Sequence, residues 1–159
     1  MTLRFIIWMV LSTALWAAEY PQMGDDIYDP SADAAADIAA ALKQADAEGK
    51  HVLLDFGANW CVWCRRLHTL FESDATVAAA LERAYVIVMI DVNTRNGTDR
   101  NAPTIVKYGE PTQHGLPVLM VLDGAGNPQV TQETGALEEG AGHSPAKVLA
   151  FLSRWAPAD

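Results

Sequence analysis

Residues 51–68, HVLLDFGANWCVWCRRLH, decide the fold of this 159-residue chain. The stretch begins with mostly apolar, strand-forming residues, and Leu67, Leu70 and Phe71 then follow at helical spacing. Cys61 and Cys64 are the only cysteines in the sequence, and they stand where the strand pattern gives way to the helix pattern. The stretch therefore predicts a strand followed by a helix that starts with two thiols.

A C-x-x-C pair at a helix start has a specific chemistry. Free backbone N–H groups and the positive end of the helix dipole lie there, and both favour a thiolate over a thiol. We expect Cys61 to attack the disulfide of a partner and Cys64, one turn further on, to resolve the mixed disulfide. A bridge between these residues closes a very small loop, so it constrains the unfolded chain little and is a poor structural staple.

Two other uses of the cysteines stay open. They are an inert structural bridge, or ligands for zinc or copper together with His68, which lies four residues beyond Cys64. The overall composition narrows the partners: a net charge of −9 argues against a nucleic-acid partner, which would require a basic surface.

The N-terminal residues predict export. Arg4 is followed by uncharged residues 5–16 and then by Ala17 and Ala18, the pattern of a secretory signal peptide over residues 1–18. The apolar segment is short for a membrane span, which needs about 20 residues. We expect a periplasmic or otherwise exported protein; an uncleaved segment that anchors the chain to the membrane is the alternative. Residues 19–30 are expected to form an extended lead-in, and residues 31–157 one domain.

The order of elements indicates the fold class. Helical and strand patterns alternate and then end in a strand hairpin, which predicts an α/β fold with a mixed central sheet and helices on both faces. The expected helices are 31–48, 61–72, one or two turns after Asp74, a short helix capped by Asn101 and a last helix from Ser144. The expected strands are 51–56, 85–92, 118–122 and 130–134. Loops are expected at 110–115 and 135–142.

Local motifs in this order resemble those of the thioredoxin-fold family over about residues 31–155. The motifs are Asp55-Phe56 with Ala58-Asn59-Trp60, then Cys61-Val62-Trp63-Cys64, Lys107-Tyr108-Gly109, and Gly115-Leu116-Pro117. Within the family, the pattern is similar to exported bacterial thioredoxin-like proteins and to the C-terminal periplasmic domain of the transmembrane thiol–disulfide interchange protein.

This resemblance implies roles for the matching residues. Cys61 matches the nucleophile, and Cys64 matches the resolving thiol. Asp55 matches the buried acid that assists proton transfer at the second cysteine, and burial is expected to raise its pKa. Pro117 matches the cis-proline, whose loop pairs with the substrate backbone. Trp60 matches the aromatic residue that flanks the motif. Trp63 departs from thioredoxin, which has Gly-Pro between its cysteines, and we expect an exposed ring there to grip a partner. Leu116 and His114 are expected to lie in the substrate groove.

The sequence also departs from the thioredoxin pattern. Gly57 stands where thioredoxin has a tryptophan, and Ile87 is expected where thioredoxin has a lysine beside the acid. The segment 110–114 is longer than in thioredoxin, so we expect it to lie beside the site and to shape partner choice.

The resemblance implies an exported thiol–disulfide oxidoreductase. It would reduce or isomerise disulfides of exported proteins through the Cys61–Cys64 pair, with no other cofactor. A membrane thiol electron donor would recharge it. The alternative is a non-enzymatic thioredoxin-fold binding module, metal-handling module or chaperone.

Overall fold

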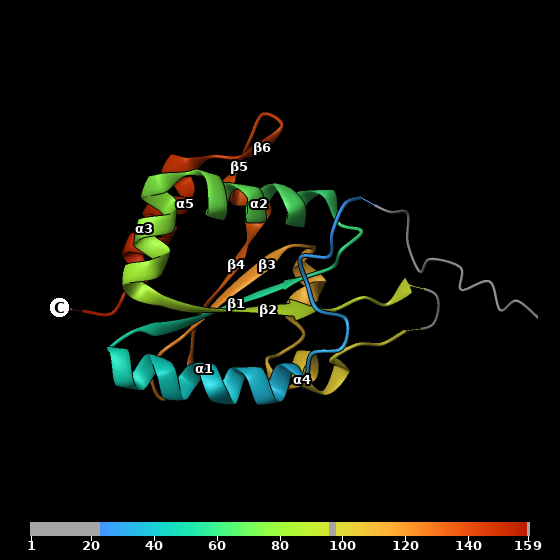
Figure 1. Ribbon diagram of the computed structural model, residues 1–159, viewed down its shortest axis with the longest axis horizontal. Coiled ribbons are helices and arrows are strands. Elements are labelled where there is room, and N and C mark those ends of the chain that lie inside the picture. Colours follow the sequence, from blue (N-terminus) through green and yellow to red (C-terminus); the bar gives the residue numbers. More distant parts are fainter. Residues whose placement is uncertain (1–22, 96–97, 159) are drawn as a thin grey trace, which may run out of the picture.

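The computed structural model describes residues 23–95 and 98–158 (Figure 1). The predicted signal peptide, residues 1–18, and the start of the lead-in lie outside these residues. The main elements are α1 (Ala34–Glu48), β1 (His51–Gly57), α2 (Val62–Ser73), α3 (Ala75–Ala84), β2 (Tyr85–Asp91), α4 (Ala102–Lys107), β3 (Val118–Leu122), β4 (Pro128–Glu133) and α5 (Pro145–Arg154). Shorter elements are the 3₁₀ turns η2 (Pro111–His114) and η3 (Thr134–Leu137) and the strands β5 (Glu138–Glu139) and β6 (Gly142–His143).

A mixed sheet forms the middle layer. Its strand order is β2-β1-β3-β4, with β1 parallel to β2 and antiparallel to β3, and β3 antiparallel to β4. Helices α1 and α4 lie on one face, and α2, α3 and α5 lie on the other (Figure 1). The predicted α/β fold with a mixed sheet and helices on both faces is confirmed.

Alternation along β1 decides which side chains reach the disulfide. Val52, Leu54 and Phe56 pack in the cluster that includes α1, whereas Leu53 packs in the cluster with α2, α3 and α5. Because side chains alternate between the faces of a strand, Asp55 lies on the same face as Leu53. The start of α2 covers that end of β1, so the acid comes to lie beneath the cysteines.

Three segments have more regular structure than the sequence pattern indicates. The helix after Asp74 has 10 residues rather than one or two turns, because four of its side chains at helical spacing are buried in the core. The stretch 110–115, expected to be a loop, contains η2. The stretch 135–142, also expected to be a loop, contains the end of η3 and the β5–β6 pair, and the buried Leu137 holds it against the core.

Asn101 is the N-cap residue of α4, as expected, but its side chain makes no capping hydrogen bond. Its Oδ1 instead accepts a hydrogen bond from the Ala34 backbone N–H at 3.2 Å, and its Nδ2 donates to the Asp91 carbonyl at 2.9 Å. Asn101 thereby joins the start of α1 to the end of β2. Within residues 23–95 and 98–158, none of the helices combines the length and apolarity needed to cross a membrane.

Candidate active site

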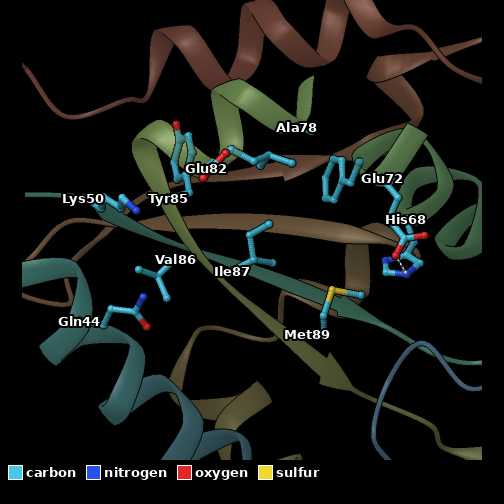
Figure 2. A pocket seen from close by; sticks show the side chains of 12 residues that line it. Gln44, Lys50, His68, Glu72, Ala78, Glu82, Tyr85, Val86, Ile87 and Met89 are labelled. Carbon is cyan, nitrogen blue, oxygen red and sulfur yellow. Dashed lines mark ion pairs between the residues drawn. The ribbon is translucent and has the colours of Figure 1, made fainter. Parts of the chain in front are cut away.

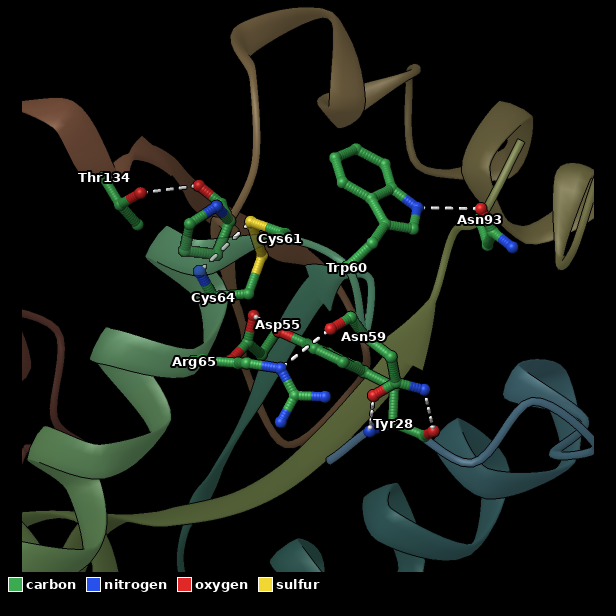
Figure 3. Close-up of a disulfide and its surroundings, with 10 residues drawn as sticks. Tyr28, Asp55, Asn59, Trp60, Cys61, Cys64, Arg65, Asn93 and Thr134 are labelled. Carbon is green, nitrogen blue, oxygen red and sulfur yellow. Dashed lines mark hydrogen bonds between the residues drawn. A yellow bond between two sulfur atoms is a disulfide. The ribbon is translucent and has the colours of Figure 1, made fainter. Parts of the chain in front are cut away.

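The disulfide between Cys61 and Cys64 lies at the N-terminus of α2 (Figure 3). Cys61 is the N-cap residue, and its sulfur accepts a hydrogen bond from the Cys64 backbone N–H at 3.1 Å. Cys61 retains 6% exposure, whereas Cys64 is fully buried. Cys61 is therefore the cysteine nearer to solvent, and its sulfur lies where helix N–H groups stabilise negative charge.

Asp55 lies beneath the disulfide and is completely buried (Figure 3). Burial raises the pKa of its carboxyl group from 3.8 to about 7, and a hydrogen bond from Tyr28 acts in the opposite direction. Among the described residues, Oδ2 of Asp55 has no hydrogen-bond partner. The carboxyl group can therefore accept or release a proton near neutral pH.

Tyr28 contacts this acid from the lead-in segment, and sequence reasoning missed it. The segment is described from Met23 onward, and Tyr28 is fully buried in one cluster with Ala58, Cys61 and Cys64. Its hydroxyl group donates a hydrogen bond to Asp55 Oδ1 at 3.0 Å. Gly57 was the feature of the sequence that could have indicated this contact. Thioredoxin has a large aromatic residue at this position, and glycine leaves space there for the ring of another residue.

Asn59 and Arg65 fasten the segment that carries Tyr28. Asn59 Oδ1 accepts hydrogen bonds from the backbone N–H groups of Ile27 and Tyr28 at 2.8 and 3.0 Å, and its Nδ2 donates to the Tyr28 carbonyl at 2.8 Å. Arg65 donates from Nε to the Asn59 carbonyl at 2.8 Å and from Nη1 to the Asp25 carbonyl at 2.9 Å. The residues around the cysteines thus hold the lead-in against the site.

Met89, rather than Ile87, occupies the position beside the acid. In the parallel pairing of β1 with β2, Asp55 is opposite Met89, whereas Ile87 is opposite Leu53. Met89 packs against the cysteine cluster, and Ile87 is 37% exposed. The expectation of Ile87 was wrong because the strand register, which the sequence did not reveal, decides which side chain lies next to Asp55.

Both tryptophans of the motif pack against the cysteine cluster and keep a partly exposed surface. Trp60 Nε1 donates to Asn93 Oδ1 at 2.8 Å, and the Arg95 guanidinium lies 3.7 Å from the ring centroid of Trp60. Trp63 meets the His143 ring edge-on, with centroids 5.6 Å apart, and Arg66 lies 4.5 Å from the Trp63 centroid.

The loop before β3 carries Leu116 and Pro117, and it lies beside the cysteine cluster. The Leu116–Pro117 peptide bond is cis, and Leu116 packs against the cysteine cluster. The Pro117 carbonyl accepts a hydrogen bond from Thr134 Oγ1 at 2.6 Å, which ties this loop to η3 (Figure 3). His114 is exposed at the end of η2. Its role in a substrate groove, and the effect of residues 110–114 on partner choice, stay predictions.

His68, the third ligand in the alternative in which the cysteines bind zinc or copper, lies beside a glutamate. His68 Nε2 lies 3.3 Å from Glu72 Oε1, in a groove of about 600 Å³ along the β2 edge (Figure 2). In the part of the chain that the structure describes, no group of three or more His, Cys, Asp or Glu side chains is arranged to hold a metal ion.

A mixed sheet with a disulfide at the first turn of α2 and an acid beneath it defines a thioredoxin-like protein. The model of the Thioredoxin-like family matches residues 33–124. The chain belongs to this family, as the sequence motifs indicated.

Relatives include thiol:disulfide interchange proteins. The chain is 33% identical over 99 residues to DsbD of Colwellia psychrerythraea, a match that covers 62% of this chain and 16% of that protein. It is 35% identical over 91 residues to DsbD of Ralstonia nicotianae, covering 57% of this chain and 14% of that protein. The chain therefore corresponds to a small part of the length of these relatives.

Solved structures agree with this relationship. A disulphide isomerase from Xylella fastidiosa Temecula1 superposes with a TM-score of 0.70 at 28% identity, covering 82% of this chain and 96% of that one. The oxidised C-terminal domain of DsbD from Neisseria meningitidis shares the fold, with a TM-score of 0.56 at 24% identity, covering 78% and 97%. The chain is thus a thioredoxin-like protein with a C-x-x-C disulfide, related to proteins named for thiol–disulfide exchange.

Proposed function

We propose that this chain is an exported thiol–disulfide oxidoreductase that reduces or isomerises disulfides of exported proteins. One observation carries the proposal: Cys61 caps α2 with its sulfur at a backbone N–H, while Cys64 lies buried above a carboxyl group whose pKa is about 7. An inert bridge requires neither the helix start nor the acid. An exchanging dithiol uses both.

The geometry supports a two-step exchange. The Cys61 thiolate attacks one sulfur of a substrate disulfide, a bond forms between them, and the other substrate sulfur leaves as a thiolate. Cys64 then gives its proton to the Asp55 carboxylate, and the Cys64 thiolate attacks the Cys61 sulfur. The Cys61–Cys64 disulfide forms, and the second substrate thiolate leaves. Two electrons pass to the substrate, and the released thiolates take protons from water. The Asp55 carboxyl group then releases the proton that it took from Cys64 to water, so the carboxylate is regenerated.

The substrate side of the site would be the surface around the cis-proline loop. Leu116 and the partly exposed Trp60 and Trp63 pack around the cysteines, so an extended substrate segment would lie across them. His114 and residues 110–114 would bound this surface and influence partner choice.

Export and recharging complete the proposal. The signal-like pattern of residues 1–18 supports export. The relatives named thiol:disulfide interchange proteins support a thiol electron donor as the partner that returns the disulfide to the dithiol. We propose that this donor lies in the membrane.

Reduction of insulin by the purified protein, with dithiothreitol as electron source, tests the activity. Cys61→Ser should abolish the accelerated precipitation of insulin. Cys64→Ser should instead accumulate a mixed disulfide with a peptide substrate, because nothing resolves it. Equal activity in the wild type and in Cys61→Ser would contradict the proposal that the protein is a thiol–disulfide oxidoreductase.

Two further measurements test direction and export. The reduction potential of the Cys61–Cys64 pair in glutathione buffers separates a reductant, with a low potential, from an oxidant or isomerase, with a higher one. Fractionation of an expressing bacterium, followed by mass analysis, should recover periplasmic protein cut after Ala17 or Ala18. Full-length protein in the membrane fraction would instead indicate an uncleaved anchor.

A further inference from the structure

We propose that Tyr28 is a positioning residue for proton transfer at Cys64: its hydroxyl group holds one oxygen of the Asp55 carboxyl group and leaves the other oxygen to exchange the proton. This inference rests on the proposed exchange activity, which it deepens. The residue comes from the segment before α1, outside the strand–helix unit that bears the cysteines.

The hydrogen bond fixes the carboxyl group asymmetrically. Tyr28 Oη lies 3.0 Å from Asp55 Oδ1, whereas Oδ2 is buried and has no partner among the described residues. A Cβ atom built at Gly57 would overlap the Tyr28 hydroxyl oxygen and lie 3.0 Å from Cys64 Sγ. The Tyr28 hydroxyl, the Asp55 carboxyl group and the Cys64 sulfur therefore meet in one small buried volume, with the acid below the disulfide (Figure 3).

Asp91 and Arg65, charged residues on the elements around Asp55, have partners other than Asp55, and of their side-chain atoms only Arg65 Nη2 is buried without one among the described residues. On β2, Asp55 is opposite Met89, and Asp91 at the strand end forms an ion pair with Arg100 at 2.6 Å. On β3, Asp55 is opposite the apolar Leu119. From α2, the cysteine pair lies above the acid, and Arg65 donates to backbone carbonyls. Among the described residues, the Tyr28 hydroxyl is the hydrogen-bond donor to this carboxyl group.

Tyr28 remains a donor throughout the reaction. Burial raises the pKa of its hydroxyl group well above the ordinary value, and the charges of Asp55 and Asp91 raise it further. The hydroxyl group therefore stays protonated and cannot serve as the base itself. It stabilises the Asp55 carboxylate by donating to it, and the hydrogen bonds of Asn59 to the Tyr28 backbone keep the ring in place.

Tyr28→Phe tests the inference, because it removes one oxygen and keeps the ring. The rate at which a mixed disulfide between Cys61 and a peptide resolves is measured by rapid acid quench from pH 5 to pH 9. We expect the midpoint of the pH profile to rise by about one unit, the size of one lost hydrogen bond to a charged group. Resolution near pH 6 should then be roughly tenfold slower, with a small difference at pH 9.

Tyr85→Phe is the matched control. Tyr85 is also buried and donates its hydroxyl group to the Leu152 carbonyl at 2.7 Å, on another part of the core. Its loss should leave the midpoint unchanged. In an Asp55→Asn background, Tyr28→Phe should no longer shift the profile, because the group that the hydroxyl positions has been replaced.

Ring-fluorinated tyrosine at position 28 provides the opposite change. Fluorine makes the hydroxyl group a stronger donor, so the midpoint should fall below that of the wild type. A purely structural role of the ring would not give shifts of opposite sign. A Tyr28→Phe midpoint equal to that of the wild type, or a shift that persists without Asp55, overturns the inference.

Carbon-13 NMR titration of the Asp55 carboxyl group in the oxidised protein separates this inference from the proposed function. Tyr28→Phe should raise the carboxyl midpoint whether or not the protein exchanges disulfides. If the wild type is inactive and the carboxyl midpoint still moves, the proposed function fails while the hydrogen bond acts on the acid as inferred. An unmoved carboxyl midpoint contradicts the positioning role in either case.

Discussion

Gly57 and Tyr28 share one space. A Cβ atom at residue 57 would overlap the Tyr28 hydroxyl oxygen and the ring carbon that bears it. The tyrosine ring therefore fills the volume that a side chain at residue 57 would otherwise occupy, beside the sulfur of Cys64. Residues 29 positions apart in the sequence thus determine together what lies under the disulfide.

Gly57→Ala should displace Tyr28. The added methyl group overpacks a buried site, so we expect the free energy of unfolding of the oxidised protein to fall by about 1–3 kcal/mol. Urea denaturation measures the loss. Gly124→Ala is the control, because a Cβ atom there meets nothing within 4 Å. Equal stability of both variants would show that Tyr28 does not occupy the space.

Asp55→Asn should change how stability depends on pH. The pKa of Asp55 is about 7 in the folded protein and near 3.8 when unfolded, so the folded state binds more protons between these values. The acid therefore lowers stability progressively as pH rises from about 4 to about 7. The variant lacks this loss. We therefore expect its free energy of unfolding, relative to that of the wild type, to increase by up to about 4 kcal/mol between pH 4 and pH 8.

The measurement is urea denaturation of both oxidised proteins at pH 4, 6 and 8. The difference between the two proteins is the informative quantity, since exposed carboxyl groups shared by both titrate in the acidic range. A constant difference across this range would place the pKa of Asp55 at its ordinary value.

Thr134→Val should loosen the Pro117 loop. The buried Thr134 hydroxyl group donates to the Pro117 carbonyl at 2.6 Å, and valine removes this hydrogen bond. We expect a loss of about 1–2 kcal/mol in unfolding free energy. Amide hydrogen exchange of Leu116, Val118 and Leu119 should also become faster. The control is Thr69→Val, since the exposed Thr69 hydroxyl group bonds to the Arg65 carbonyl within one helix. A comparable loss in both variants would contradict a special role of Thr134.

His143→Phe should make the free energy of unfolding less sensitive to acid. Burial lowers the pKa of His143, and the Arg66 charge lowers it further, so the ring next to Trp63 is kept neutral. The unfolded state then binds more protons, and stability is lost as pH falls below about 6.5. Phenylalanine keeps an aromatic ring beside Trp63 without a proton to gain.

We expect the unfolding free energy of this variant to fall less between pH 7 and pH 5 than that of the wild type. His114→Phe, at an exposed position, is the comparison variant. If His114→Phe flattens the dependence as much as His143→Phe does, burial of His143 is not the cause.

The sequence by itself determined the strand–helix unit and the chemistry at its junction. A run of mostly apolar strand formers and then apolar residues at helical spacing lie within a few residues of Cys61 and Cys64. They predict that the cysteines stand at the start of a helix and that an acid precedes them on a strand. The spacing of two cysteines three apart also decides that they can close a small ring. These features are local, and the structure contains them where the pattern placed them.

Only the tertiary structure decided what surrounds that junction. Whether Met89 or Ile87 lies beside Asp55 depends on the register of β1 with β2, and that register is set by packing of the whole sheet. The partner of Asp55 comes from Tyr28, 27 residues earlier, because Asn59 and Arg65 hold an irregular segment against the site. No local periodicity encodes such contacts, since they arise when distant segments exclude water from the same buried volume.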